Sequence, residues 1–288
     1  MGDGVTRRMA GTLRTIIVLL LSAVTAGSTA GRPQAPPAFD HGYRAYAALL
    51  RAHVRGARVD YRALAAGRPA LDAVAAGFDA AAADVERWSR NEQIAFWINA
   101  YNVFTLRAIV DHYPIRGRWF SLAPRNSIRQ IDGVWTTLTW RAAGRTVTLD
   151  DIEHRILRPV FRDPRVHFAL NCASVSCPPL AAEPYRAATL DADLDAAARR
   201  HLAGPLGLVV DSRTLRVSSI FKWYGEDFVE RFADAGPAVG SPVDRAILGV
   251  VRTYGPAAAA ALAASGRARV RFLDYDWSLN DVARDGRR

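Results

Sequence analysis

The sequence predicts an α+β fold in which helices pack with a small mixed or antiparallel sheet. Residues 92–112 are apolar on nearly every side over helical length, and such a helix lies inside a protein. Several shorter stretches alternate apolar and polar residues on either side of a turn, which is typical of hairpins. Half of the 288 residues are hydrophobic and 23% are charged, so the chain has enough apolar surface for a core.

Residues 1–30 have the composition of a secretory signal peptide. Three arginines precede a short apolar run at 16–21, and small residues follow up to Ala30. We expect cleavage after Ala30 and then a proline-rich linker at 31–38. An uncleaved membrane anchor is the alternative, although the apolar run is short for a span. The sequence therefore predicts an exported, periplasmic protein with no transmembrane span after signal removal.

The first elements of the domain are predicted to be helical, because apolar residues recur there at helical spacing. Residues 39–53 and 70–88 are expected to form helices, and residues 59–61 a short strand or turn between them. Ser89 and Glu92 have the spacing of a capping box at the start of the central helix.

Two asparagines interrupt the apolar central helix. Asn99 and Asn102 are three residues apart, so they lie on one face. A buried amide without hydrogen-bond partners costs about 1–3 kcal/mol. Both side chains therefore need polar partners, which indicates either an architectural polar network or part of a functional site.

A hairpin is predicted at 134–148, followed by a helix that Thr148 caps. Glu153 falls on the apolar stripe of that helix, and His154 is its neighbour. An ionisable group in such a position is either paired with an arginine or functional. Glu153 and His154 are therefore candidate site residues.

Both cysteines of the chain lie in one short loop. An apolar run at 166–170 predicts a buried strand, which opens into a loop with Cys172, Ser174, Ser176 and Cys177 before a double proline. Functional side chains often follow such strand ends. Free cysteine is also among the most buried residue types, so the pair has a purely structural alternative.

The remaining elements follow from the same two periodicities: helices at 189–201 and 220–232, a hairpin at 208–218 and a strand at 269–273. The second of these helices carries Asp227, one turn from two aromatic residues, and Lys222, the only lysine of the chain. No internal repeat or second linker interrupts this order. Residues 39–282 are therefore predicted to form one domain, followed by a tail at 283–288.

The formal net charge of +10 comes almost wholly from arginine. The basic residues are scattered and do not alternate with aromatic residues, so no nucleic-acid partner is expected. The spacing of histidine and cysteine matches no standard zinc pattern. The sequence predicts no metal site and no cofactor.

Six motifs stand in order along the mature chain: 59–61 (VDY), 95–102 (AFWINAYN), 149–154 (LDDIEH), 167–180 (HFALNCASVSCPPL), 221–228 (FKWYGEDF) and 275–280 (YDWSLN). Together they resemble the domain-of-unknown-function family 547, which occurs in exported bacterial proteins and as a C-terminal module in plant proteins. The resemblance implies that the six motifs belong to one domain. It implies no particular activity.

A cysteine nucleophile is one hypothesis for the site. A thiolate needs a nearby base and a group that orients this base. His167 precedes Cys172 by five residues, which places the two side chains on opposite faces of a straight strand and makes His167 the lesser candidate. His154 is the preferred base, oriented by Glu153 or Asn99. A thiol, a histidine and an orienting amide or carboxylate are also the catalytic groups of papain-like and transglutaminase-like enzymes. By this similarity the hypothesis predicts a thiol-dependent hydrolase or acyl transferase. Those enzymes, however, carry the cysteine on the buried helix.

A non-catalytic periplasmic binding or interaction module is the alternative hypothesis. In this alternative Cys172 and Cys177 form a structural disulfide, and closing such a short loop contributes about 2–3 kcal/mol. The candidate binding residues are Asn102, Ser174, Ser176, Lys222 and Asp227.

Overall fold

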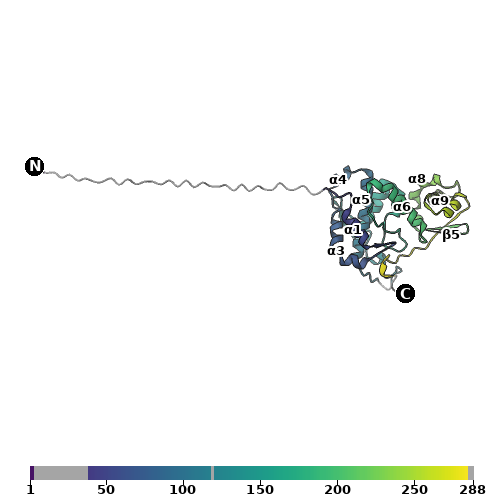
Figure 1. Cartoon of the computed structure of the whole chain (residues 1–288), viewed down its shortest axis with the longest axis horizontal. Coiled ribbons are helices and arrows are strands. Elements are labelled where there is room, and N and C mark those ends of the chain that lie inside the picture. Colours follow the sequence, from purple (N-terminus) through teal and green to yellow (C-terminus); the bar gives the residue numbers. More distant parts are fainter. Residues whose placement is uncertain (3–37, 118–119, 285–288) are drawn as a thin grey trace. The chain divides into compact units, whose positions relative to one another are not determined.

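The predicted central helix is α5, Arg90–Asp111, in the computed structural model, which describes residues 1–2, 38–117 and 120–284 (Figure 1). The predicted signal peptide and linker, apart from Met1, Gly2 and Ala38, and the last four residues of the tail lie outside the described residues. Contacts group Phe39–Arg288 into one compact unit. Within the described ranges, no helix has the length and apolarity that a bilayer crossing requires.

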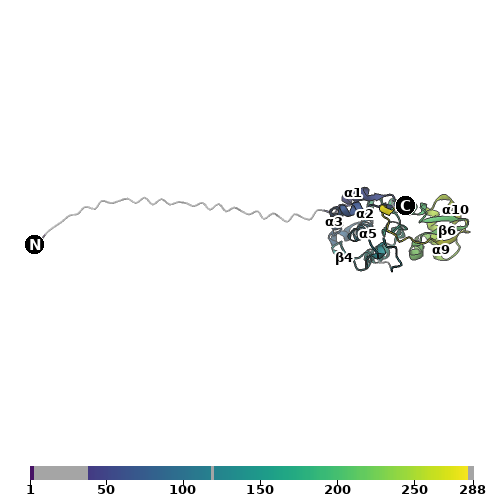
Figure 2. The ribbon, with the colours of Figure 1, turned by 90° about the horizontal axis from the view of Figure 1, so that it is seen from below.

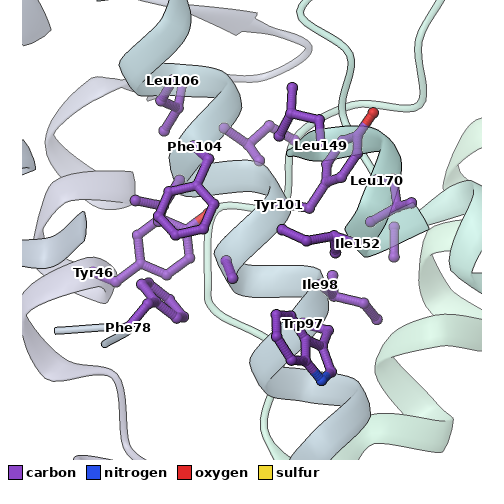
Figure 3. Close-up of a cluster of buried hydrophobic side chains, with 14 of the residues drawn as sticks. Tyr46, Phe78, Trp97, Ile98, Tyr101, Phe104, Leu106, Leu149, Ile152 and Leu170 are labelled. Atoms are coloured by element: carbon purple, nitrogen blue, oxygen red, sulfur yellow. The ribbon is translucent and has the colours of Figure 1, made fainter. Parts of the chain in front are cut away.

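The start of α5 is set by the predicted capping box. The Ser89 hydroxyl accepts the amide hydrogen of Glu92, and the Glu92 carboxylate accepts that of Ser89. Beyond this cap nearly every side chain is buried, which confirms the prediction of an interior helix. In Figure 3, α5 stands between one group of apolar side chains that includes Phe78 and another that includes Ile152.

Helices surround α5. It packs chiefly against α2 (Tyr61–Ala66), α3 (Arg68–Ala76) and η2 (Asp151–Phe161), and all of them contribute to the first hydrophobic cluster. The other elements of this part are α1 (Arg44–His53), β1 (Val54–Arg55), β2 (Arg58–Val59), α4 (Ala82–Arg87), η1 (Ile128–Gln130), β3 (Trp140–Ala142), β4 (Arg145–Val147) and η4 (Ala187–Thr189). The strands here form two antiparallel pairs, β1 with β2 and β3 with β4.

A second hydrophobic cluster lies around a three-stranded sheet. The strands are β5 (Leu208–Asp211), β6 (Thr214–Val217) and β7 (Arg269–Phe272); β5 and β6 are antiparallel, and β6 and β7 are parallel. Helices α9 and α10 lie beside β6, as Figure 2 shows. The helical elements of this part are α6 (Leu190–Ala203), α7 (Ile220–Tyr224), η5 (Gly225–Phe228), α8 (Val229–Phe232), η6 (Ala233–Ala235), α9 (Pro242–Tyr254) and α10 (Ala257–Ala264). The last element, η7 (Val282–Arg284), follows Asp281, which pairs with Val59 of β2 in the first part.

The α+β fold class is confirmed, and several local predictions are wrong. Residues 70–88 form two helices, α3 and α4, rather than one, and residues 134–137 form turns before β3 rather than a strand. The run at 166–170 is not a strand but largely part of η3, Pro164–Phe168, a short 3-10 helix. It begins there because the Asp163 carboxylate caps the amide of Arg165 and Pro164 suits a first helical position. The central helix packs on helices, because the largest sheet belongs to the second cluster.

Candidate functional site

Glu153 is the buried carboxylate that the helical periodicity predicted. Its helix, η2, begins where the Thr148 hydroxyl accepts the amide hydrogen of Asp151 and the Asp151 carboxylate accepts that of Thr148. Glu153 is only 8% exposed and lies next to Ile152, which is fully buried. The start of η2 therefore carries a carboxylate into the interior.

Two tyrosines, rather than an arginine, hold Glu153. The phenols of Tyr101, on α5, and Tyr224, on α7, hydrogen-bond to its carboxylate. Burial and then the negative charge of Glu153 raise the pKa of both phenols, so both remain protonated donors. Among the described residues, no arginine or lysine forms an ion pair with Glu153. The carboxylate is thus stabilised by neutral groups.

His167 lies between two carboxylates. Its Nε2 is 2.8 Å from Asp227 Oδ2, and its Nδ1 is 3.9 Å from Glu153 Oε1. An ionised carboxylate only accepts hydrogen bonds, so Nε2 carries a proton. The ring is 4% exposed and stacks on Tyr224 with 4.2 Å between ring centroids. His167 is therefore fixed in position, although the sequence ranked it below His154.

Asp227 also pairs with an arginine. Arg158 Nε and Nη2 donate to its two carboxylate oxygens at 2.6 and 2.9 Å, a fork geometry that carboxylates favour. Burial opposes the charge of Asp227, but the hydrogen bonds from His167 and Arg158 outweigh it and lower the pKa of Asp227 far below its usual range. Asp227 therefore orients His167 and neutralises Arg158.

His154 belongs to the same network. Arg158 Nη1 lies 2.7 Å from His154 Nδ1, and the guanidinium can only donate. Nδ1 is therefore the acceptor and the ring is neutral, with its proton on Nε2, 3.4 Å from Asp150 Oδ1. The ring nitrogens of His154 are thus directed at Arg158 and Asp150.

Cys172 and Cys177 form a disulfide bond, with 6.0 Å between their Cα atoms. The Cys172 sulfur lies 3.1 Å from the Ser174 hydroxyl and 3.2 Å from the Tyr275 phenol oxygen. No histidine nitrogen is bonded to this sulfur in the described part of the chain. Cys172 is therefore bonded to Cys177, as the alternative hypothesis predicted, and is not hydrogen-bonded to His154, the base that the nucleophile hypothesis predicted.

Residues 172–177, the disulfide loop, are hydrogen-bonded to residues 274–281, the C-terminal segment. The amide of Val175 donates to Ser278 O at 2.8 Å, and that of Asn280 donates to Ala173 O at 3.0 Å. The Ser176 hydroxyl accepts the amide hydrogen of Asp276 at 2.9 Å. Ser176 therefore fixes the loop, while Ser174 contacts the sulfur and a phenol.

A cavity of about 340 Å³ opens between these groups. Four of its lining residues form a connected cluster of rings, the aromatic wall: Trp135, Trp223, Tyr275 and Trp277, with 4.6 to 6.2 Å between neighbouring ring centroids. The remaining lining residues are Tyr101, Asp150, Glu153, His154, His167, Leu170, Cys172, Cys177, Pro178, Ile220 and Tyr224. Glu153, His154, His167 and Cys172, all predicted for the site, thus line one cavity.

The predicted asparagines lie outside the lining of the cavity. Asn99 donates to Tyr185 O at 2.8 Å and accepts from its amide at 3.0 Å. Asn102 donates to Ala169 O at 3.0 Å and accepts from the amide of Asn171 at 2.9 Å. Each amide thus donates one hydrogen bond to a main-chain group and accepts one from another, and Asn99 also hydrogen-bonds to the Tyr43 side chain. No histidine is bonded to Asn99 among the described residues, so the expected contact between Asn99 and a catalytic histidine is not seen.

Lys222, one of the predicted binding residues, is exposed on α7 and does not line the cavity. Sequence reasoning missed Trp223, Tyr224 and Tyr275 as site residues, although the motifs 221–228 and 275–280 contain all three. Among the described residues, no group of three histidine, cysteine or carboxylate side chains has the arrangement of a metal site.

Comparison with known proteins identifies a family but no activity. Residues 85–202 match the family described as "Protein of unknown function, DUF547". Searches of curated proteins and of solved structures find no match to the chain. The matched range includes α5, η2, η3 and the disulfide loop, and with them Glu153, His167 and both cysteines. The chain therefore carries a DUF547 domain.

Proposed function

We propose that the chain is a ligand-binding module and that the cavity beside Glu153 and His167 is its binding site. One observation carries this proposal: a cavity of about 340 Å³ is lined both by the aromatic wall and by ionisable side chains. Small-molecule sites in proteins are concave and mostly apolar, with a few polar groups that orient the ligand. This is the non-catalytic alternative drawn from the sequence.

In this proposal the disulfide is structural. Both sulfurs are used in the bond, and the described residues contain no free cysteine. The bond closes the loop that the C-terminal segment holds, and so it fixes part of the cavity wall. Disulfides persist in oxidising compartments, which supports the proposal that the protein is exported and periplasmic.

Fragment binding tests the proposal. Saturation-transfer NMR with a panel of small polar, charged and aromatic fragments is expected to find ligands for the wild type. Trp223→Ala is expected to lose them, because the 44% exposed Trp223 ring lines the cavity. Phe272→Ala is the matched control, since Phe272 is 40% exposed on β7 and lies outside the lining. The absence of ligands, or ligands that both variants retain, would refute the binding site.

A thiol-dependent hydrolase or acyl transferase is the second candidate, and it requires a reduced Cys172. It is favoured by the presence of Cys172, His154 and His167 on one cavity. After reduction, this candidate predicts that iodoacetamide alkylates Cys172 faster than free cysteine near neutral pH and that His154→Ala or His167→Ala slows the reaction. Alkylation no faster than that of free cysteine would exclude it.

A further inference from the structure

The charge of the cavity differs in sign from the charge of the chain. The sequence has 38 Lys and Arg residues against 28 Asp and Glu residues. The lining within the described residues contains Asp150 and Glu153 but no lysine or arginine. Carboxylates are negative at neutral pH. The cavity is therefore a local exception in a basic protein.

Two arginines contact residues that line the cavity. The carboxylate of Asp227 neutralises Arg158 through two hydrogen bonds, and the guanidinium of Arg129 lies 5.1 Å from the ring centroid of Trp277. His154 accepts a hydrogen bond from Arg158 and is neutral. If His167 is protonated, it offsets one of the two lining carboxylates and leaves the other. The side chains that line the cavity keep a net negative charge in either state of His167.

Glu153 is the most buried of these negative groups. It accepts hydrogen bonds from two phenols, and its nearest ionisable nitrogen, His167 Nδ1, is 3.9 Å away. Burial reduces solvent screening, so a charge in the cavity interacts with Glu153 more strongly than it would in water. Among the described residues no arginine or lysine pairs with Glu153, so a cationic ligand can pair with this carboxylate.

The aromatic wall faces the same cavity. Trp223, Tyr275 and Trp277 pack together with 4.6 to 5.7 Å between their centroids. The faces of such rings attract cations through their quadrupole, and sites for quaternary ammonium ions are built from them. Indole and phenol faces together with buried negative charge are complementary to an organic ammonium ion rather than to an anion.

We propose that the ligand of this cavity is a small organic cation, an ammonium ion whose charge lies between Glu153 and the aromatic wall. This inference rests on the proposed function, because it names the chemical class of the ligand for the same cavity. An alkylammonium head group presents both positive charge for the carboxylates and apolar surface for the rings. The volume of about 340 Å³ accommodates such a group with a short chain.

Isothermal titration calorimetry on the disulfide-bonded full chain tests this class. The probes are choline and butylammonium, each compared with its uncharged counterpart, 3,3-dimethylbutan-1-ol for choline and butan-1-ol for butylammonium. At least one cation is expected to bind about tenfold or more tightly than its counterpart, because the shape is shared and only the charge differs. Equal affinities within both pairs, or binding of neither cation, would overturn the cation class.

Variants connect the preference to this site. Glu153→Gln removes the charge but keeps an acceptor for the two phenols, and it is expected to abolish the preference for the cation. Glu86→Gln, at an exposed position outside the lining, is the matched control and is expected to retain it. Asp150→Asn is a second test at a less buried position and is expected to weaken cation binding in the same direction. An unchanged preference in both Glu153→Gln and Asp150→Asn would overturn the inference.

The fragment panel separates the two proposals. If neutral fragments such as sugars bind and depend on Trp223 while the cations do not bind, the binding site stands and the cation class is wrong. If no fragment binds, the proposed function itself fails.

Discussion

Replacing Asn102 with alanine tests how the interior helix is tied to the site. Asn102 is 2% exposed and joins α5 to two main-chain groups, the carbonyl of Ala169 and the amide of Asn171, at 3.0 and 2.9 Å. Asn102→Ala leaves both groups buried without this partner. Each such group costs about 1–3 kcal/mol, so the free energy of unfolding is expected to fall by about 2–6 kcal/mol. This is a large part of the roughly 5–15 kcal/mol that stabilises a typical domain.

Urea denaturation followed by circular dichroism measures this loss. The midpoint is expected to fall while the slope with denaturant stays constant, because the native state buries the same surface. Asn91→Ala, at a partly exposed position in the first turn of α5, is the control and is expected to change the free energy of unfolding by less than about 0.5 kcal/mol. A loss in Asn102→Ala no larger than that of the control would refute the role assigned to this amide.

Three further predictions concern charge and the disulfide. In urea denaturation, Arg165→Met is expected to lose about 3–5 kcal/mol, because it removes the buried partner of Asp163. The Asp191 carboxylate, which also pairs with Arg165, is 78% exposed, so Asp191→Asn is expected to lower the free energy of unfolding by less than about 1 kcal/mol. Equal losses in Arg165→Met and Asp191→Asn would contradict the distinction between the buried and the exposed ion pair. Reduction of the disulfide with dithiothreitol is expected to lower the free energy of unfolding by about 2 kcal/mol, so an unchanged midpoint would show that the loop is fixed by other contacts. The folded pKa of Asp227 is lowered, so its contribution is complete above the unfolded value of about 4 and is lost as the pH falls below it. The difference in free energy of unfolding between wild type and Asp227→Asn is therefore expected to narrow below about pH 4. A difference that widens on acidification would contradict a lowered pKa of Asp227 in the folded state.

Local patterns predicted the parts of the fold that local physics determines. The capping box at Ser89, the interior position of α5 and the burial of Glu153 all depend on spacing along one helix, and all three agree with the structure. The apolar run at 166–170 was ambiguous, because a buried strand and a short buried helix have the same composition. Asp163 and Pro164, just before it, are the residues that begin a helical turn.

The candidate site was predicted only in part, because its members come from distant segments. The sequence showed that Asn99 and Asn102 need polar partners but not that main-chain groups supply them. Strand geometry argued against His167, yet the chain turns there as a 3-10 helix and carries the ring to Asp227. The aromatic wall joins α7 to the C-terminal segment, and no local pattern states that they meet.

The origin of the cavity walls has a consequence for divergence within the family. Glu153, His167 and the disulfide loop lie inside the range that matches DUF547, whereas Trp223, Tyr224 and the 275–277 cluster lie outside it. The acidic residues and histidines of the lining and most of the aromatic wall thus come from separate parts of the chain. Under the proposed function, substitutions in the later part therefore change the aromatic wall, and with it the ligand that fits, without altering Glu153 or His167.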